Sequence, residues 1–286
     1  MDVLKPHTRD LGGGLSVHRV LPGMPHQMVG PFIFFDQMGP VTIAPEQNVD
    51  VRPHPHIGLA TVTWLFEGEL IHRDSLGVVQ PIAPGDVNWM TAGRGIVHSE
   101  RQNPTGRKSA RPMFGIQSWL ALPKAHERAE RGFTHHPAAT LPRLAMPGID
   151  LRLVAGEAFG EKAPAPTLSP LFYLAAEMSA GSSLALPPEH EERGVYLVQG
   201  EIAVEGAPLP ARHMAVLPAG ATARIEARGA SRVMLLGGAK MDGPRFLWWN
   251  YVASSREAID EARARWREQR FPAVPGETEF IPLPEK

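Results

Sequence analysis

Short runs of β-branched and aromatic residues, separated by glycine and proline, recur along most of the 286-residue chain. The clearest run reads "LATVTWLFE" at residues 59–67 and directly follows "PHPHIG" at residues 53–58. β-Branched and aromatic residues favour strands, whereas glycine and proline favour the turns between them. With 28 glycines and 29 prolines spread along the chain, the pattern predicts an all-β protein of many short strands.

One segment near the C-terminus predicts a long helix instead. It begins near residues 254–255 and continues through "REAIDEARARWREQR". Ser254 and Glu257 have the spacing of a capping box, and Pro272 follows the end of the segment. One face of this helix collects three apolar residues: Ile259, Ala262 and Trp266. We therefore expect the helix to dock on a barrel or on a partner subunit.

The strand pattern repeats within the chain. "LFEGEL" at residues 65–70 and "LVQGEI" at residues 197–202 each contain an apolar strand, a turn at x-Gly-Glu and an apolar continuation. Further along, "TAG" at residues 91–93 is echoed by "PAG" at residues 218–220. Such an internal echo indicates that two related β-domains arose by duplication.

We therefore predict an N-terminal domain of residues 1–135 and a C-terminal domain of residues 136–286 that includes the helix. The Pro-rich stretches at residues 137–147 and 164–170 lie between the two copies and are expected to belong to the inter-domain region.

Composition excludes several classes of function. The formal net charge is -1, so the chain lacks the basic balance that direct nucleic-acid binding requires. Cysteine is absent, which excludes disulfides, thiolate metal ligands and a Cys nucleophile. No stretch approaches the roughly 20 apolar residues of a membrane span, and the N-terminus lacks a signal-peptide pattern. We expect a cytoplasmic protein without membrane contact, with nuclear entry also open in a eukaryote.

Two pairs of polar residues suggest a metal site. His54 and His56 are two residues apart, so on an extended strand they point to the same face. His98 and Glu100 have the same spacing within "TAGRGIVHSER" at residues 91–101. If the two strands pair antiparallel, three imidazoles and one carboxylate gather on one face, a set that suits a divalent first-row transition metal. A single His-x-His occurs often by chance, and the second pair is what favours metal binding.

The second copy lacks this set. Aligned on the x-Gly-Glu turn, His54 and His56 correspond to Leu186 and Pro188. No His-x-His or His-x-Glu pair lies on a strand-like run there. We expect the C-terminal domain to be the same scaffold without its metal.

The longest motifs resemble the signature of the pirin family. They are "HPHIGLATVTWLFEGEL", "HRDSLG" and "PGDVNWMTAGRGIVHSER", supported by "VHRVLPG", "GPFIFFDQMGP" and "FIPLPE". The resemblance covers nearly the whole chain and is strongest in the N-terminal half. It implies two tandem cupin domains, each an antiparallel jelly-roll-like β-barrel, here with a C-terminal helix.

The resemblance also implies one metal in the N-terminal barrel, usually iron, held by three His and one Glu. These ligands carry over to His54, His56, His98 and Glu100. Fe(II) is therefore the expected cofactor. Zn, Cu, Ni, Co and Mn stay open, because these ligands do not fix the metal's identity.

Family resemblance leaves two functions open. Several pirin-like proteins resemble quercetin 2,3-dioxygenases, which implies a dioxygenase that opens a flavonol such as quercetin at a mononuclear metal centre. Others are regulatory binding proteins, which implies a metal- or redox-dependent partner of a transcription factor or enzyme with little catalysis. The expected partner is a small aromatic substrate in the first case and a protein in the second. Two tandem barrels can satisfy themselves as a monomer.

Candidate residues for chemistry follow from the dioxygenase interpretation. Glu100 is the candidate base that accepts the proton of the flavonol hydroxyl. Aromatic residues on predicted strands could form an apolar slot for the substrate, with plain core packing as the alternative: Phe34, Trp64, Phe66, Trp89 and Trp119. Gln117 could place an amide near the site or bond to backbone.

Two further histidine motifs are interpreted without a chemical role. The His72-Arg73-Asp74 triplet lies in a strand context, and we expect a turn with internal hydrogen bonds there. His135 and His136 are flanked by proline and are expected in an exposed loop.

Overall fold

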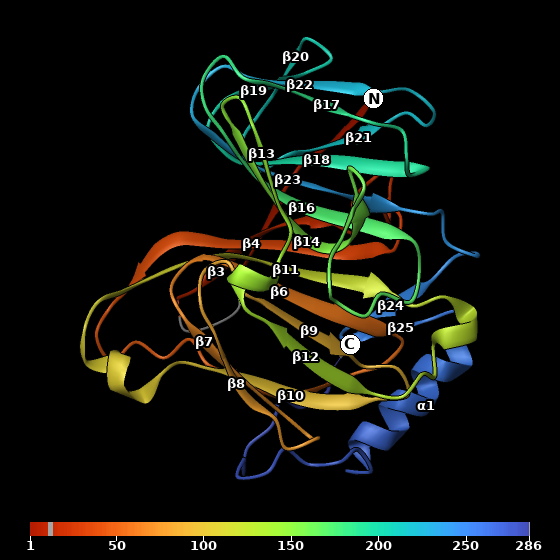
Figure 1. The fold of residues 1–286 in the computed structure, drawn as a ribbon. Helices are drawn as coiled ribbons and strands as arrows, with labels where there is room; N and C mark the ends of the chain where they lie inside the picture. Colours follow the sequence, from red (N-terminus) through yellow and green to blue (C-terminus); the bar gives the residue numbers. More distant parts are fainter. Residues whose placement is uncertain (11–13, 286) are drawn as a thin grey trace. The chain divides into compact units, whose positions relative to one another are not determined.

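The computed structural model describes residues 1–10 and 14–285, which form mostly antiparallel β-sheet (Figure 1). The strands of the first half are β1 (Asp2–Leu4), β2 (His7–Asp10), β3 (Ser16–Leu21), β4 (Phe32–Ile43), β5 (Val51–His56), β6 (Leu59–Glu67), β7 (Leu70–Asp74), β8 (Val79–Ile82), β9 (Val87–Thr91), β10 (Ile96–Arg101), β11 (Arg111–Ala121), β12 (Gly132–His136) and β13 (Arg143–Met146).

The strands of the second half are β14 (Ile149–Ala158), β15 (Glu161–Lys162), β16 (Leu171–Met178), β17 (Ser183–Leu186), β18 (Glu192–Gln199), β19 (Ile202–Val204), β20 (Ala207–Leu209), β21 (Met214–Leu217), β22 (Ala223–Ala227), β23 (Ser231–Gly238), β24 (Phe246–Trp248) and β25 (Tyr251–Ala253). Within residues 1–10 and 14–285, the helices are α1 (Arg256–Arg267) and three short 3₁₀ turns: η1 (Pro104–Lys108), η2 (Lys124–His126) and η3 (Ala138–Thr140). No helix in the described part of the chain has the length and apolar character needed to cross a membrane.

The chain forms two compact units that are interleaved in sequence. The unit called here the N-terminal barrel consists of Asp10–Val17, Met38–His135 and Asp242–Lys286. The unit called the C-terminal barrel consists of Met1–Arg9, His18–Gln37 and His136–Met241.

This division differs from the expected split into residues 1–135 and 136–286. It keeps the boundary between His135 and His136, but each unit also takes chain from the other side of that boundary. Helix α1 belongs to the N-terminal barrel, because its apolar face is buried there. Both Pro-rich stretches lie inside the C-terminal barrel, where residues 143–146 form strand β13.

In the described part of the chain, two large sheets form most of the N-terminal barrel, and β24 pairs with β25 as a separate two-stranded sheet. The larger has the strand order β12-β9-β6-β11-β4-β3-β2, and the smaller has the order β5-β10-β7-β8. Consecutive strands pass from one sheet to the other, as β6 does to β7 and β9 to β10. Part of its core is the cluster that includes Val17, Leu65, Leu70 and Ile82, all of which are buried. The smaller sheet is the one that carries the predicted metal ligands.

The C-terminal barrel repeats this plan. Its smaller sheet has the order β17-β22-β19-β20, which reproduces the order of β5-β10-β7-β8. The glycines of the two x-Gly-Glu turns have the same structural role. Gly68 (φ +93) and Gly200 (φ +100) each lie where the chain leaves the larger sheet and enters the smaller one. A Cβ there would lie 2.5 Å from the Pro112 carbonyl oxygen and 2.4 Å from that of Ala230, respectively.

The interior of the C-terminal barrel is apolar. Leu184, Leu186, Ala223 and Ile225 from its smaller sheet are buried in one hydrophobic cluster. Strands that correspond to the histidine-bearing strands of the other barrel thus supply aliphatic side chains here.

Helix α1 forms where the sequence predicts it and buries the predicted face of Ile259, Ala262 and Trp266. Its N-cap is Ser255, whose hydroxyl accepts a hydrogen bond from the Ala258 amide at 3.2 Å. The predicted cap, Ser254, was wrong by one residue. The Ser254 hydroxyl donates instead to the Glu127 carboxylate at 2.8 Å.

Docking of α1 takes place within the chain. Ile259, Ala262 and Trp266 share a buried cluster with Ile57 and Val97, which flank the predicted ligand positions. Helix α1 and the residues that flank the predicted ligands therefore share one hydrophobic core.

Candidate metal centre

Three histidines converge inside the N-terminal barrel. Strands β5 and β10 pair antiparallel, with His98 opposite His54 and Ile96 opposite His56. His54, His56 and His98 are 7%, 1% and 2% exposed, respectively. One nitrogen from each ring lies within 4.8 Å of the other two. The antiparallel pairing that we expected from the two-residue spacings thus brings these three imidazoles together.

The spacing of the nitrogens fits a shared ion. The Nε2 atoms of His56 and His98 are 3.0 Å apart. Imidazole nitrogens bind zinc-like ions at about 2.1 Å, and two of them at right angles around one ion would be separated by roughly 3.0 Å. The cluster could therefore bind a metal.

Hydrogen bonds orient two of the rings. His54 donates from Nδ1 to the Arg52 carbonyl at 2.9 Å, and His56 donates from Nδ1 to the Asn250 carbonyl at 3.1 Å. Each ring then keeps its lone pair on Nε2, as metal-binding histidines usually do.

Burial keeps the three imidazoles neutral. It lowers the pKa of His54 to about 4 and lowers the pKa of His56 and of His98 well below the ordinary value, with repulsion from neighbouring histidines as a smaller cause. Neutral rings need not lose a proton before they bind a cation.

Glu100 lies two residues beyond His98 on β10 but is not part of the 4.8 Å cluster. A register shift separates His98 from Glu100 in the pairing with β5, so that Glu100 lies opposite Val51. Burial raises the pKa of Glu100 to about 7. A cation beside it would stabilise the charged form.

Of the aromatic candidates, Trp119 contacts the cluster, with its ring centroid 5.0 Å from that of His56 in an edge-to-face arrangement. The others have contacts elsewhere: Trp64 with Phe66, Phe66 with Phe114, Trp89 with Thr91, and Phe34 with Arg19 in the C-terminal barrel. Gln117 accepts a hydrogen bond from the Thr63 hydroxyl at 2.9 Å, so the expected alternative of a backbone bond was wrong.

His72 lies beside the cluster, a position that its sequence motif did not predict. His72, Arg73 and Asp74 lie on strand β7, so the expected turn at these residues was wrong. The expected internal hydrogen bonds are present, since Asp74 accepts from His72 and from two backbone amides. However, the Nδ1 atom of His72 also lies 3.4 Å from the Nδ1 atom of His98. His72 and Asp74 are two residues apart, as are the members of the other two pairs. Strand β7 lies beside β10 in the smaller sheet. That shared spacing could have revealed the contact.

His135 and His136 form the end of strand β12, so their expected place in an exposed loop was wrong. Both side chains are partly buried. His135 Nδ1 lies 2.8 Å from the Asn88 side-chain oxygen, within hydrogen-bonding distance.

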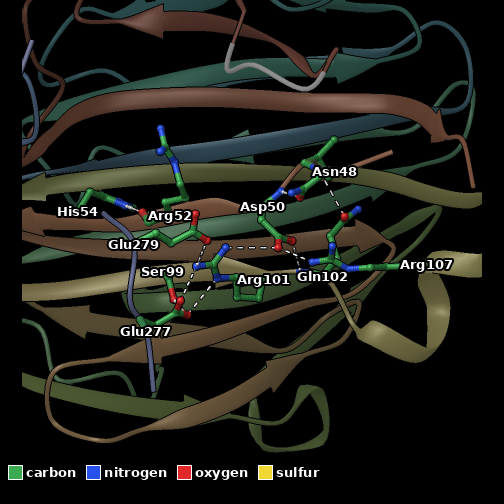
Figure 2. Close-up of polar contacts among 11 residues, drawn as sticks. Asn48, Asp50, Arg52, His54, Ser99, Arg101, Gln102, Arg107, Glu277 and Glu279 are labelled. Atoms are coloured by element: carbon green, nitrogen blue, oxygen red, sulfur yellow. Dashed lines mark hydrogen bonds and ion pairs between the residues drawn. The ribbon is translucent and has the colours of Figure 1, made fainter. Parts of the chain in front are cut away.

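Arg101 on strand β10 forms ion pairs with the C-terminal segment, and we call this group of contacts the ionic clamp (Figure 2). Arg101 donates to Glu277 at 3.0 Å and to Glu279 at 2.9 Å, and the Ser99 hydroxyl donates to Glu277 at 2.9 Å. Ser99 and Arg101 alternate with His98 and Glu100 along β10, so they face away from the cluster. The segment is also tied to β5, because the Ile281 amide donates to the Pro53 carbonyl at 2.8 Å.

The clamp predicts unequal roles for its two carboxylates. Glu277→Ala should lower the free energy of unfolding by about 1–3 kcal/mol, because the partly buried Arg101 and Ser99 lose an acceptor. Glu279→Ala is the matched control and should cost less than about 1 kcal/mol, since Glu279 is 51% exposed and Glu277 only 11%. Urea unfolding of both variants measures the difference, and equal losses would refute the assignment.

Acid should release the same segment. The Arg101 guanidinium holds the pKa of Glu277 below its ordinary value. A lowered folded-state pKa stabilises the protein above the unfolded value near 4.5, and this contribution is lost as pH falls through the folded-state pKa. The protection of the amides of residues 276–285 against exchange, relative to the intrinsic rate at each pH, should therefore fall below pH 4.5 in the wild type and change less with pH in Glu277→Ala.

Comparisons with known proteins match both halves of the chain. The Pirin family model matches residues 14–120, and the model of the pirin C-terminal cupin domain matches residues 173–272. A pirin-like protein of Caulobacter vibrioides is 48% identical over 99% of both chains. A Pseudomonas aeruginosa protein named "Putative quercetin 2,3-dioxygenase" is 39% identical over 91% of this chain and 81% of its own. A crystal structure of quercetin 2,3-dioxygenase from Acinetobacter baumannii superposes with a TM-score of 0.90, at 34% identity over 100% of this chain and 96% of the other.

Proposed function

This chain belongs to the pirin family of two-domain cupins, and on that premise we propose that it is a metal-dependent dioxygenase that opens a flavonol such as quercetin. The observation that carries the proposal is the convergence of His54, His56 and His98, one nitrogen from each ring within 4.8 Å of the others. The names of the two quercetin dioxygenase relatives support the reaction type.

We assign His54, His56, His98 and Glu100 as the metal ligands. The first three present converging nitrogens, and Glu100 follows on the same strand with a desolvated carboxylate. Fe(II) is the metal proposed, and Zn, Cu, Ni, Co or Mn suit the same nitrogen and oxygen donors. A divalent transition metal, when bound, would supply Lewis acidity toward the flavonol oxygens and redox chemistry toward dioxygen.

The chain's own groups have three tasks in this reaction. Glu100 accepts the proton of the flavonol 3-hydroxyl, which leaves an electron-rich enolate for reaction with dioxygen. Trp119, whose ring lies in a T-shaped contact with His56, would supply an apolar surface for a flat substrate. The low exposure of His54, His56 and His98 would limit the access of water to a substrate bound there. Both atoms of dioxygen enter the substrate, the central ring opens and carbon monoxide leaves.

Oxygen consumption tests the proposal. Iron-reconstituted protein is mixed with quercetin in an oxygen electrode, beside a His54→Ala control. We expect metal-dependent uptake of oxygen, loss of the flavonol absorption band and release of carbon monoxide. Absence of uptake in protein shown to hold its iron would refute the dioxygenase and favour the redox-dependent regulatory binding protein.

Glu100→Gln separates proton transfer from metal binding. The amide keeps the size of the side chain and one oxygen ligand but is a far weaker base. We expect kcat to fall by a factor of about 10²–10⁴ while most of the metal is retained. Metal content and turnover are measured on the same samples. Full turnover in metal-loaded Glu100→Gln would exclude Glu100 as the base.

A further inference from the structure

The three cluster histidines differ in the partner of their second nitrogen. His54 and His56 donate to backbone carbonyls, which only accept, so their protons are fixed on Nδ1. The Nδ1 atom of His98 instead faces another ring nitrogen, Nδ1 of His72, at 3.4 Å. A ring nitrogen can donate or accept, so this contact does not by itself decide where His98 carries its proton.

The position of that proton decides whether His98 can be a ligand. With the proton on Nε2, His98 donates to Nε2 of His56 at 3.0 Å and has no lone pair for a metal there. With the proton on Nδ1, it donates to His72, and its Nε2 lone pair joins that of His56. Only the second tautomer completes the cluster.

The hydrogen bond between Asp74 and His72 favours one of the two His98 tautomers. The Asp74 side chain is fully buried, and Oδ1 accepts from the Leu76 amide at 2.8 Å and the Val78 amide at 3.2 Å. Oδ2 lies 3.0 Å from Nε2 of His72. Where this carboxylate is ionised it can only accept, so Nε2 of His72 carries a proton. With a single ring proton there, Nδ1 of His72 is the acceptor that faces His98.

Packing holds this arrangement in place. The His72 ring stacks on Phe133, with 4.3 Å between centroids and 20° between ring planes. Strands β7 and β10 pair with Asp74 opposite His98 and His72 opposite Glu100. His72 thus reaches diagonally across the strand pair to His98.

We propose that Asp74 and His72 are positioning residues that hold His98 in the metal-binding tautomer. This inference rests on the proposed metal centre and adds a chain from carboxylate to imidazole to ligand. The other two histidine ligands are oriented by backbone carbonyls, so His98 is the histidine ligand whose orientation depends on side chains that mutation can change. Partners of this kind typically change metal affinity by 10- to 100-fold.

Asp74→Asn reverses the direction of the hydrogen bonds from residue 74 to His72 and from His72 to His98, because asparagine has nearly the same shape as aspartate but can donate. The amide oxygen can still accept from the Leu76 and Val78 amides, while its NH₂ group replaces Oδ2 and donates to Nε2 of His72. His72 must then carry its proton on Nδ1, and His98 must move its own proton to Nε2. We expect Co(II) affinity to fall by about 10- to 100-fold.

Two substitutions of His72 form a matched pair. His72→Asn places an amide oxygen near the original Nδ1, where it can accept from His98. His72→Gln places its amide near the original Nε2, where it keeps the contact with Asp74 but offers His98 no acceptor. We expect His72→Asn to bind Co(II) within about threefold of the wild type and His72→Gln to resemble Asp74→Asn.

The experiment measures Co(II) affinity by chelator competition, and the tautomer of His98 in metal-free protein by long-range ¹H–¹⁵N NMR. The wild type should show His98 protonated on Nδ1, and Asp74→Asn should show it on Nε2. An unchanged tautomer and affinity in Asp74→Asn, or equal losses in His72→Asn and His72→Gln, would overturn the proposal. His54→Ala distinguishes failure of this inference from failure of the proposed metal centre. If His54→Ala binds Co(II) with the affinity of the wild type, the assignment of the metal ligands is wrong.

Discussion

The His54→Ala variant is expected to lose metal binding by at least about 100-fold and, with it, all metal-dependent oxygen uptake. One ring nitrogen of His54 is among three that lie within 4.8 Å of one another, and alanine removes it. His56 and His98 would then hold the ion with only Glu100 as a third donor. Metal content after gel filtration and oxygen uptake with quercetin measure the two losses.

Thermal unfolding gives an independent reading of the same variant. A metal that binds only the folded state at a free concentration of 100 times its Kd stabilises the wild type by about 2.7 kcal/mol. Added metal should therefore raise the Tm of the wild type and leave that of His54→Ala unchanged. His7→Ala is the control, because His7 is an exposed histidine of β2. A metal-dependent Tm shift in His54→Ala equal to that of the wild type would contradict the ligand assignment.

Gly58→Ala is expected to lower the free energy of unfolding by about 2–5 kcal/mol. Gly58 joins β5 to β6 at φ +66, and a Cβ there would lie 2.0 Å from the Val252 carbonyl oxygen. Relief of this clash needs β25 to move, and the neighbouring Asn250 carbonyl orients His56. Metal affinity should therefore fall together with stability.

Gly77→Ala measures the cost of a left-handed backbone without the steric clash that Gly58→Ala adds. Gly77 also has a positive φ, +87, but a Cβ there would meet no atom within 4 Å. It should lose only the cost of a left-handed backbone, about 1–2 kcal/mol. Urea unfolding followed by tryptophan fluorescence compares the two variants. If both lose the same stability, the contact with Val252 has no role.

Much of the fold was predictable because its determinants are local. Alternation and turn residues predict the strands, and the echoed x-Gly-Glu turns predict two related barrels, since each needs a left-handed residue at Gly68 or Gly200. The apolar face of α1 was also predictable from its spacing. The helix cap was missed by one residue, because Ser254 and Ser255 are both good caps and only the contact of Ser254 with Glu127 separates them.

By itself, the sequence determined the two-residue spacings of His54/His56, His98/Glu100 and His72/Asp74, and with them the face that each side chain shares. Only the tertiary structure decided which of these pairs meet. The order β5-β10-β7 places His72 against His98, and the shift beside Glu100 leaves that carboxylate outside the cluster of three histidines. The return of residues 242–286 to the N-terminal barrel was likewise invisible along the chain. Strand periodicity is a local property of the backbone, whereas strand order and docking depend on contacts between segments far apart in sequence.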